Sequence, residues 1–401
     1  LYDNKTFTFG PNYIIPKPLD PRVLMYVAPA VAKAAMESGV AQAPIKNFKA
    51  YKEKLEALNS FSRGFIRASI NRMKAFRRSS KKGVPKIIFP EGHSTKILRA
   101  LNSLKKEKIM EPILLGYKEV IQEKIKELEL EEIQDITIHR PVEHKNYNKY
   151  VQMLYEKRKR KGVMLSEAER LAASPFYFSA LALEAGDVQG LVSGATQNYA
   201  DCIKPLLQVL GAKKGEVVAG FNMLLIRNKV LFFADTTVNI DPTSEQLAQI
   251  AINCADTALH SYRVKPKIAM LSYSNFTGKK GNPKKMQEAT QIVQRLRPDL
   301  TIDGEMQADT ALNPDIVQRI FSFCHIKDGA NILIFPNLDS GNIAYKLVQQ
   351  LGEGEVLGPL LLGLKKPAHV LQRTCTVNDA INTIILTTLQ AQQFMAQEAK
   401  E

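Results

Sequence analysis

The segment Val84-Pro-Lys-Ile-Ile-Phe-Pro-Glu-Gly92 opens the pattern that decides the fold of this 401-residue chain. Its apolar centre predicts a short buried strand over 86–89, and the Pro-Glu-Gly sequence ends that strand. From this point to the C-terminus, short apolar runs alternate with longer segments of helical spacing. Such alternation is typical of helices layered on mostly parallel sheets, so the sequence predicts an α/β fold.

The strands and helices of this pattern can be placed along the chain. We predict strands over Lys86–Phe89, Pro112–Leu115, Leu191–Ser193, Glu216–Leu225, Val230–Ala234, Ile268–Ser272 and Ile332–Phe335. We predict helices over Lys96–Lys106, Leu165–Ala173, Tyr199–Val209, Glu245–Ala258, Lys284–Arg295 and Asp379–Ala396. Several strands end in small or polar residues, and ligands bind at the carboxyl ends of strands in open α/β sheets. We therefore expect the functional site at these ends.

The 318 residues from 84 onward are many for a single core. We predict two α/β lobes with mostly parallel sheets and a cleft between them. The first lobe comprises 84–212 and 359–401, and the second comprises 213–358.

The N-terminal part has a different character. Residues 1–45 are rich in proline and contain one predicted helix, Val27–Val40, which is too short to hold a core of its own. Residues 46–83 have apolar positions at steps of three and four, so they predict a basic amphipathic helix in two pieces. We interpret it as a linker whose apolar face packs on a neighbour, in preference to a membrane-surface helix. Because the chain opens with Leu1 and not with Met, we expect it to be part of a longer protein.

Composition and charge exclude several classes of protein. With 45% apolar and 24% charged residues, the chain is neither disordered nor collagen-like. The net charge of +15 is concentrated in two windows, 46–82 with +10 and 145–162 with +6, so a protein coated in positive charge for nucleic acid is disfavoured. The four cysteines and six histidines form no zinc or disulfide pattern, and we assign no metal site. Free thiols, with no membrane-spanning run and no signal peptide, predict a cytoplasmic protein.

Two loops have the composition of anion-binding segments. Ser193-Gly-Ala-Thr196 lies between a strand and a helix, where backbone N–H groups could hold an anion; a tight turn is the structural alternative. Ser272 to Gly281 contains two lysines but lacks the spacing of a phosphate-binding P-loop, so only a flexible loop that offers lysines to an anion is left.

Two further segments concentrate polar groups. Asp303-Gly-Glu-Met-Gln-Ala-Asp309 could supply an acid and a base, or could be a polar turn that bonds its own backbone. Arg373-Thr-Cys-Thr-Val-Asn-Asp379 precedes a helix; Thr376 or Asn378 could cap it, with Asp379 in its first turn, and Arg373 could hold a phosphate.

Taken together in their order, these segments resemble the phosphate acetyltransferase (phosphotransacetylase) family from about Val84 onward. The resemblance rests on Lys86-Ile-Ile-Phe-Pro-Glu-Gly-His93, Ser193-Gly-Ala-Thr196, Phe233-Ala-Asp-Thr-Thr-Val-Asn239, Ala269-Met-Leu-Ser-Tyr-Ser-Asn-Phe276, Asp303–Asp309, Phe335-Pro-Asn-Leu-Asp-Ser-Gly-Asn-Ile-Ala-Tyr-Lys-Leu347 and Arg373–Asp379. Separately, Phe9–Arg22 and Ala28–Val40 resemble the carboxyl end of a bacterial malic-enzyme domain. This order is similar to that of hybrid NADP-dependent malic enzymes that carry a phosphotransacetylase-like domain.

The resemblance implies catalytic roles for two residues. In the family, the thiol of CoA attacks acetyl phosphate, an Asp serves as its base, and a Ser-Arg pair stabilises charge and holds phosphate. The Asp matches Asp379 and the Arg matches Arg373, but Gln372 stands where the family has Ser. Arg158 matches a family arginine, whereas Lys204 and the Ser94-Thr95-Lys96 element depart from the family pattern.

On this basis the resemblance implies a cleft that binds acetyl-CoA or CoA. The expected ligand-binding residues are Arg158, Lys204, Ser193, Gly194, Thr196, Ser274, Asn275, Asp303, Gln307, Asn342 and Arg373. We expect an acetyl-CoA-sensing regulatory domain without acetyl transfer, and the alternatives are an active phosphate acetyltransferase or, from the charge alone, a nucleic-acid binder.

The resemblance also implies what lies outside this chain. NADP and Mg²⁺ or Mn²⁺ are expected only in the malic-enzyme part, where malate is oxidised and decarboxylated to pyruvate. The expected partners are acetyl-CoA, the malic-enzyme catalytic domain of the same chain, and further copies in a homo-oligomer, a dimer through this domain or a larger assembly. No nucleic acid and no membrane are expected.

Overall fold

The computed structural model describes residues 21–48, 50–52, 55, 61–79, 83–226, 229–352 and 355–398. The chain forms two compact units, 1–69 and 70–401. In the first unit, helix α1 (Pro21–Glu37) confirms the predicted N-terminal helix but begins earlier, with Pro21 at its first position. Most of Phe9–Arg22 lies outside the described residues. The predicted boundaries of the linker and of the two lobes stay predictions.

Helix α3 (Phe61–Ser79) is the second piece of the predicted amphipathic segment, and the first piece lies partly outside the described residues. The boundary between the two units falls within this helix. Its last ten residues belong to the second unit, where Met73 is fully buried and Lys74 pairs with Glu107. The end of the basic segment therefore has a packed apolar face and solvent-facing charges.

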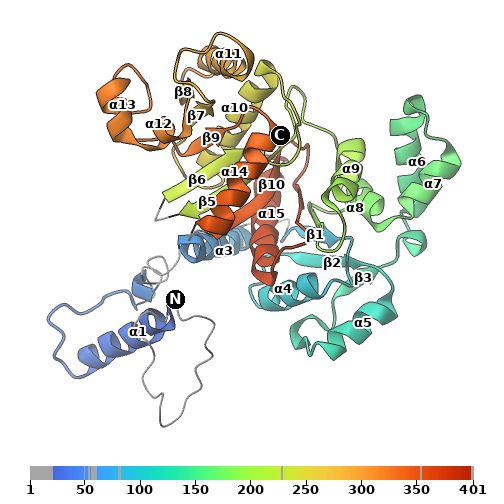
Figure 1. The fold of residues 1–401 in the computed structure, drawn as a ribbon. Helices are drawn as coiled ribbons and strands as arrows, with labels where there is room; N and C mark the ends of the chain where they lie inside the picture. The colour runs from blue at the N-terminus through green and yellow to red at the C-terminus, as the bar shows by residue number, and fades with distance from the viewer. Residues whose placement is uncertain are drawn as a thin grey trace. The chain divides into compact units, whose positions relative to one another are not determined.

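The second unit contains two sheets (Figure 1). The first has the order β11-β4-β1-β2-β3 and is parallel throughout. Its strands are β1 (Lys86–Phe89), β2 (Glu111–Leu115), β3 (Thr137–His139), β4 (Gly190–Ser193) and β11 (Ala368–Val370).

The second sheet has the order β10-β5-β6-β9-β7-β8, with an antiparallel edge formed by β10, β5 and β6. Its strands are β5 (Ala219–Ile226), β6 (Lys229–Ala234), β7 (Lys267–Leu271), β8 (Thr301–Met306), β9 (Ile332–Ile334) and β10 (Glu355–Leu362). The predicted α/β fold with two sheets, mostly parallel, is confirmed.

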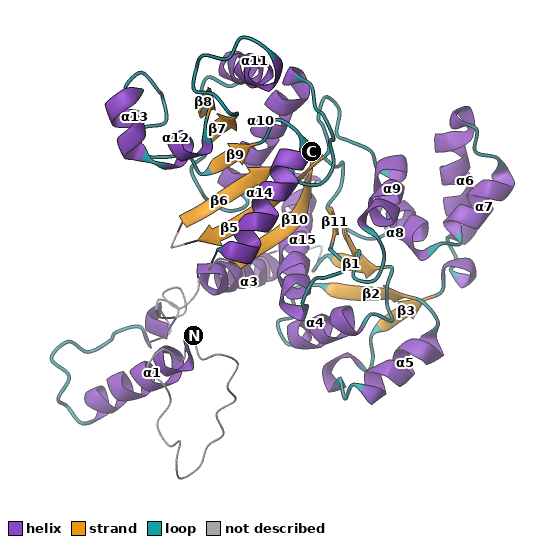
Figure 2. Cartoon of the chain, in the orientation of Figure 1, coloured by secondary structure: helices purple, strands orange, loops and turns teal. Residues whose placement is uncertain are grey.

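Helices cover both sheets (Figure 2). Those that follow first-sheet strands are α4 (Thr95–Lys105), α5 (Lys118–Glu127), α6 (Tyr147–Arg158), α7 (Leu165–Ala172), α8 (Pro175–Glu184) and α9 (Tyr199–Val209). Those of the second sheet are α10 (Ser244–His260), α11 (Gly281–Leu296), α12 (Ala308–Leu312), α13 (Pro314–Ile320) and α14 (Leu338–Leu351). The last helix, α15 (Val377–Glu398), contacts β4 of one sheet and β10 of the other.

All seven predicted strands are present, and β3, β8, β10 and β11 were not predicted. β8 contains Asp303, Gly304 and Glu305, residue types that are depleted in strands. β3 and β11 have three residues each, too few for a periodic signal. β10 contains Gly358 and Pro359, which ordinarily argue against a strand. The structure accommodates this proline at an irregularity of an edge strand, where a missing N–H costs no ladder bond.

Candidate ligand-binding cleft

A cavity of about 440 Å³ lies where the carboxyl-end loops of the two sheets meet. It is lined by Gln197, Asn198, Tyr199, Thr237, Leu338, Asp339, Asn342, Ile343, Lys346, Gln372 and Arg373. The first three residues precede or begin α9, and the last two precede α15, so these come from the first-sheet side. The others come from the loop after β6 and from α14, on the second-sheet side. The cavity therefore lies between the two halves of the unit, as the sequence predicted for a cleft.

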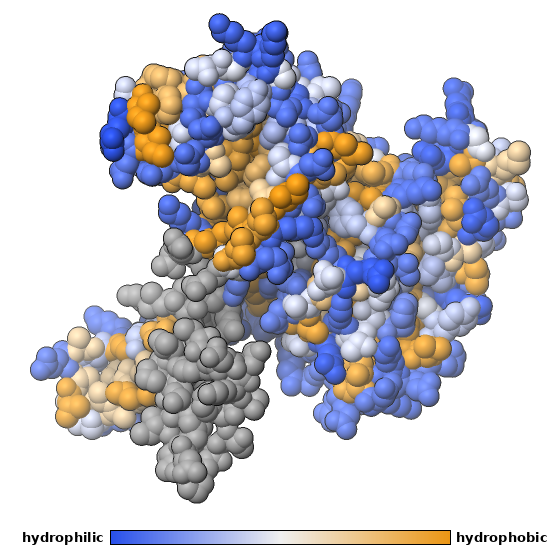
Figure 3. All heavy atoms as spheres, in the orientation of Figure 1, coloured by the Kyte–Doolittle hydropathy of each residue, from blue (hydrophilic) through white to orange (hydrophobic). Residues whose placement is uncertain are grey.

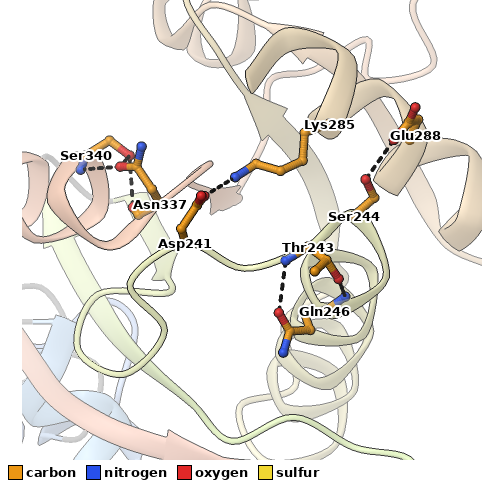
Figure 4. A network of polar contacts seen from close by, with 8 residues as sticks. All are labelled: Asp241, Thr243, Ser244, Gln246, Lys285, Glu288, Asn337 and Ser340. Atoms are coloured by element: carbon orange, nitrogen blue, oxygen red, sulfur yellow. Dashed lines mark hydrogen bonds and ion pairs between the residues drawn. The ribbon is translucent and has the colours of Figure 1, made fainter. Parts of the chain in front are cut away.

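One wall of the cavity is a face of α14. Asn337 caps this helix, because its Oδ1 accepts a hydrogen bond from the backbone N–H of Ser340 at 3.0 Å (Figure 4). Leu338, Asn342 and Lys346 are four residues apart and so lie on one face, the face that lines the cavity. The helix thus presents an apolar residue, an amide and a cation in a row.

The loop that carries Thr237 continues to α10 and is fixed at its far end (Figure 4). Lys285 of α11 pairs with Asp241 at 2.5 Å, and Thr243 forms a capping box with Gln246 at the start of α10. These contacts fix the end of the loop between β6 and α10, which carries Thr237 of the cavity lining.

Arg373 is the main cation on the opposite wall. Its side chain is exposed, and one guanidinium nitrogen lies 3.4 Å from Oδ1 of Asn198. Its backbone carbonyl accepts a hydrogen bond from Lys96 Nζ at 2.7 Å, so the lysine of the divergent Ser94-Thr95-Lys96 element holds this loop. The guanidinium remains directed to a solvent-accessible cavity, where it can bind an anion in two-pronged fashion.

Gln372 makes a contact that a serine could not make. Its Nε2 lies 2.5 Å from the hydroxyl oxygen of Tyr345, a residue of α14 that is 1% exposed. The bond joins the loop before α15 to α14, and so links the two sides of the cleft. A second bond across the two sides links the hydroxyls of Tyr199 and Thr237 at 3.1 Å. Burial raises the pKa of the Tyr199 phenol, which stays protonated.

Asp379 caps the helix in which it lies. The backbone N–H and the hydroxyl of Thr376 donate to its Oδ2 at 2.7 and 2.9 Å, and Thr376 Oγ1 accepts from the N–H of Asp379 at 3.1 Å. This reciprocal pattern is a capping box, with Thr376 as the N-cap. Asp379 is not among the residues that line the cavity. The capping role therefore occupies one carboxylate oxygen of the residue that the family resemblance assigns as base.

The loop Ser193–Thr196 does bind an anion, but the anion is a carboxylate of the protein itself. Glu91 is 2% exposed and accepts hydrogen bonds from the backbone N–H groups of Gly194, Ala195, Thr196 and Gln197 at 2.5–3.2 Å. The Thr196 hydroxyl adds a fifth bond at 2.6 Å. The N–H groups that were expected to hold a ligand are thus engaged with Glu91, which ties the loop after β4 to the loop after β1.

Two other buried carboxylates act in the same way on the second sheet. Asp235 is 2% exposed and accepts from the N–H groups of Gly220, Thr237, Val238 and Asn239 at 2.8–3.2 Å. Glu305 is fully buried, and its Oε1 accepts from Ser274 Oγ at 3.0 Å and from the N–H of Gly278 at 2.8 Å. Each carboxylate therefore fixes a loop at the carboxyl end of a strand.

The polar segment 303–309 and the loop 272–281 are brought together, but away from the cavity. Asn275 and Gln307 exchange two hydrogen bonds, at 2.8 and 2.9 Å. Asp303 is 8% exposed and accepts from the backbone N–H of His325 at 2.7 Å. None of Ser274, Asn275, Asp303 and Gln307 lines the cavity. Asp303 to Met306 belong to strand β8, and the bonds named here join residues 22 to 32 positions apart, so the segment is not the local polar turn that the sequence offered as an alternative.

The other two expected cations also lie elsewhere. Arg158 ends α6 and is half-buried, with a buried Nε that has no hydrogen-bond partner among the described residues. It is near enough to Tyr177 to counteract the rise in pKa that burial causes in that phenol. Lys204 is exposed on α9. Of the eleven expected ligand-binding residues, Asn342 and Arg373 line the cavity.

Sequence reasoning missed several residues of the cavity wall. Gln197, Asn198 and Tyr199 directly follow the Ser193–Thr196 turn, and Ile343 and Lys346 lie within the segment 335–347 that was already singled out. A helical wheel of that segment would have placed Leu338, Asn342 and Lys346 on one face. Within the described part of the chain, no group of three or more His, Cys, Asp or Glu side chains could hold a metal ion. None of the described helices has the length and hydropathy needed to cross a bilayer.

Comparison with known proteins gives one family. The family model described as phosphate acetyl/butaryl transferase matches residues 71–388. A phosphotransacetylase structure from Streptococcus pyogenes has a TM-score of 0.75 and 36% identity, and the match covers 81% of this chain and 98% of that one. The phosphate acetyltransferase of Clostridium acetobutylicum is 37% identical over 322 residues, which are 78% of this chain and 96% of that protein.

A second kind of relative matches nearly the whole chain. The NADP-dependent malic enzyme of Salmonella typhimurium is 35% identical over 397 residues, which are 98% of this chain and 51% of that protein. The chain therefore spans about half the length of the malic enzymes that it matches.

Proposed function

The chain belongs to the phosphate acetyl/butaryl transferase family, and from this premise we propose that it is the acetyl-CoA-sensing regulatory domain of an NADP-dependent malic enzyme. Acetyl-CoA binds in the 440 Å³ cavity and is released unchanged. The parent protein oxidises and decarboxylates malate to pyruvate, with NADP and Mg²⁺ or Mn²⁺ bound in its other half.

The hydrogen bond between Gln372 and Tyr345 carries this proposal. A phosphate acetyltransferase needs a small hydroxyl at position 372 to stabilise charge that develops during transfer, and here an amide faces a phenol at 2.5 Å. Arg373 beside it is exposed to the cavity and retains the capacity to hold a phosphate group. Arg373 can still bind an anion, whereas Gln372 replaces the hydroxyl that the reaction needs. This combination favours a domain that binds acetyl-CoA without turnover.

The extent of the two kinds of alignment supports the malic-enzyme assignment. The family model begins at residue 71, and the alignment with the Clostridium enzyme covers 78% of the chain. The malic-enzyme alignment covers 98%, so it includes residues before the family domain. Those residues carry the Phe9–Arg22 and Ala28–Val40 segments that resemble a malic-enzyme domain.

The regulatory role follows from linkage between two sites. If acetyl-CoA binds one conformation of the assembly better, it shifts the malic site by the same coupling free energy, typically about 1–3 kcal/mol. Helix α3, which crosses from one compact unit to the other, is the covalent path for that shift.

Two measurements on the 401-residue chain test the proposal. Isothermal titration with acetyl-CoA should show binding, and an assay of acetyl-CoA formation from acetyl phosphate and CoA should show no turnover. Absence of binding contradicts the sensing role. In the full-length malic enzyme, Arg373→Ala should relieve inhibition of malate oxidation by acetyl-CoA, and unchanged inhibition would show that the site is wrongly placed.

An active phosphate acetyltransferase is the second candidate function, because Arg373 and Asp379 are both retained. Turnover in the transfer assay that is abolished by Asp379→Asn would establish it. The capping box of Asp379 leaves its Oδ1 as the oxygen that could accept the thiol proton.

We also propose that the domain forms a homo-oligomer. Helix α14 carries Ile343, Leu347 and Leu351, which are 57%, 53% and 82% exposed, and Ile343 also lines the cavity (Figure 3). Three apolar residues four apart on an exposed helix form a strip of the kind that is buried in an interface. Sedimentation should give a dimer, and Leu347→Glu should weaken it; a monomeric wild-type chain would contradict this assignment.

A further inference from the structure

A second cavity, of about 180 Å³, lies away from the cleft at the crossing between the two sheets. It is lined by the end of β10, the segment that leads to β11, the last turn of α10 and the second half of α15. Its residues are Lys213, Thr257, Ser261, Leu361, Leu362, Gly363, Leu364, Lys365, Lys366, Pro367, Ala368, Gln390, Gln393, Phe394 and Gln397. We propose that this hinge pocket is a binding site for a small tetrahedral oxyanion such as inorganic phosphate.

The lining of the pocket has one sign of charge. Three lysines and three glutamines are present, and no aspartate or glutamate. Lys366 donates to the carbonyls of Leu183 and Glu184 at 3.0 and 3.1 Å, and both carbonyls belong to α8, outside the lining, so its ammonium group is engaged there. Lys213 lies 3.9 Å from Glu216, which is outside the lining. The wall therefore has a net positive charge, and Lys365 is its exposed cation without an ion-pair partner among the described residues.

The buried His369 determines the orientation of one glutamine. The backbone N–H of Leu361 donates to Nδ1 of His369 at 2.9 Å, so Nδ1 is an acceptor and carries no proton. Burial lowers the pKa of His369 to about 4, so the ring is neutral and its proton is on Nε2. That N–H donates to Oε1 of Gln390 at 2.8 Å. The acceptor of Gln390 is thereby used, and its NH₂ group is left to donate in the pocket.

Gln393, one turn further along α15, is oriented in the same sense. The hydroxyl of Ser261 donates to its Oε1 at 3.3 Å, so its remaining polar group is again the NH₂. Two amides on one helix face, both with their oxygens engaged inside the protein, present donors only. Donors without acceptors suit an oxyanion and disfavour a cation or a neutral sugar.

An arginine that contacts a lining residue adds an independent observation. A guanidinium nitrogen of Arg72, on α3, lies 3.5 Å from the carbonyl oxygen of the lining residue Ser261. Burial and the nearby Arg263 both lower the pKa of Arg72, so two like charges stand close together there. An anion between them and the lysines would relieve this repulsion. The size of the cavity restricts the ligand to a small ion or to the phosphate end of a larger molecule.

Phosphate binding in this pocket is independent of the proposed acetyl-CoA site, and the two sites can be tested separately. In an Arg373→Gln background, which weakens anion binding at the cleft, phosphate should still bind in isothermal titration and should raise the melting temperature of the chain. Sulfate, which has the same shape and charge, should compete, and chloride at equal ionic strength should not. No phosphate binding in this background overturns the proposal.

Gln393→Glu places a carboxylate in the pocket at unchanged size and should weaken phosphate binding at least tenfold. The matched change Gln349→Glu, on the exposed face of α14, should leave it unchanged. If Gln393→Glu proves unfolded, the double variant Arg72→Gln/Lys213→Gln serves instead, with Lys118→Gln/Lys126→Gln on α5 as its control. Equal phosphate affinity in the pocket variant and its control contradicts the assignment. Binding of a nucleoside monophosphate but not of phosphate would overturn the free-ion form of the proposal.

Discussion

Two loops at the carboxyl ends of first-sheet strands are both built to hold negative charge, and they differ in where that charge comes from. The loop after β4 holds the buried carboxylate of Glu91 with four N–H groups and a hydroxyl. The loop after β11 holds Arg373 by its backbone and leaves its guanidinium exposed beside a cavity. Both belong to segments that resemble one family, yet one is a structural joint and the other is open to a ligand.

The contrast shows that the composition of a loop does not determine whether its charge is available. Gly194 has a φ of +93°, and a Cβ there would meet the backbone oxygen of Leu371 at 2.3 Å, so the glycine serves close packing as much as anion binding. Whether such a loop can bind a ligand depends on whether a residue from elsewhere in the chain already occupies its N–H groups. For 194–197 that residue is Glu91, which lies 103 residues away from Gly194 in sequence.

The largest loss of stability should follow from removing the buried carboxylate of Glu91. Glu91→Gln replaces an acceptor-only carboxylate by a group that has one acceptor oxygen and an NH₂ facing other N–H groups. Because hydrogen bonds to a buried charge contribute about 1.5–3 kcal/mol each, we expect the free energy of unfolding in urea to fall by at least about 3 kcal/mol. Glu123→Gln on the exposed side of α5 should change it by less than about 0.5 kcal/mol. Equal losses of unfolding free energy in the two variants would show that Glu91 does not stabilise the loop after β4.

A second internal contact should make stability depend on pH. His369 is fully buried with a pKa of about 4, below the ordinary value of 6.5. The unfolded chain therefore takes up a proton below pH 6.5 that the folded chain refuses until about pH 4. Stability from this group is constant above pH 6.5 and falls by about 3 kcal/mol between pH 6.5 and pH 4.

Comparison of wild type with His369→Gln isolates this histidine from the others, because burial also lowers the pKa of His139 and His144. Denaturant unfolding at pH 7.5, 6 and 4.5 measures it. The difference in unfolding free energy between wild type and variant should shrink as the pH falls. A difference independent of pH would contradict the assigned protonation.

A substitution at Arg373, in the exposed loop after β11, should change ligand affinity and leave the free energy of unfolding nearly unchanged. Arg373→Ala removes an exposed guanidinium whose one side-chain hydrogen bond in the structure is the long contact with Asn198. We expect acetyl-CoA affinity to fall about tenfold, since a desolvated charge-assisted contact is worth about 1.5–3 kcal/mol, while the unfolding free energy changes little. Arg160→Ala, within the basic window 145–162, is the matched control by titration. An equal loss in both variants would mean that net charge and not Arg373 attracts the ligand.

The sequence was sufficient for the fold because strands such as β1 and β9 are short apolar runs whose signal is local. It could place Asn342 and Arg373 at a cleft because both follow strand ends. It could not show that Glu91, Asp235 and Glu305 fill the anion-binding loops, since these contacts join residues up to about a hundred positions apart. Nor could it separate the capping role of Asp379 from a catalytic one, because both need a carboxylate at the same position of the same turn.

The smallest effect is expected at position 372, where substitutions test whether the side chain makes a structural contact or takes part in the reaction. Gln372→Ser restores the hydroxyl that the family resemblance assigns there and removes the bond to Tyr345. Loss of one hydrogen bond at a half-buried position should lower the unfolding free energy by about 1 kcal/mol. Tyr345→Phe, which removes the partner hydroxyl and keeps the ring, should lower it by a similar amount.

The double variant should lose no more than either single change, because both remove the same bond. Additive losses would show that the two side chains do not interact across the cleft. Turnover separates the two roles further. Gln372→Ser should bring acetyl-CoA formation above background and Tyr345→Phe should not, since only the former supplies a hydroxyl beside Arg373. Absence of turnover in both variants would place the barrier elsewhere, at the carboxylate of Asp379, whose Oδ2 is engaged by Thr376.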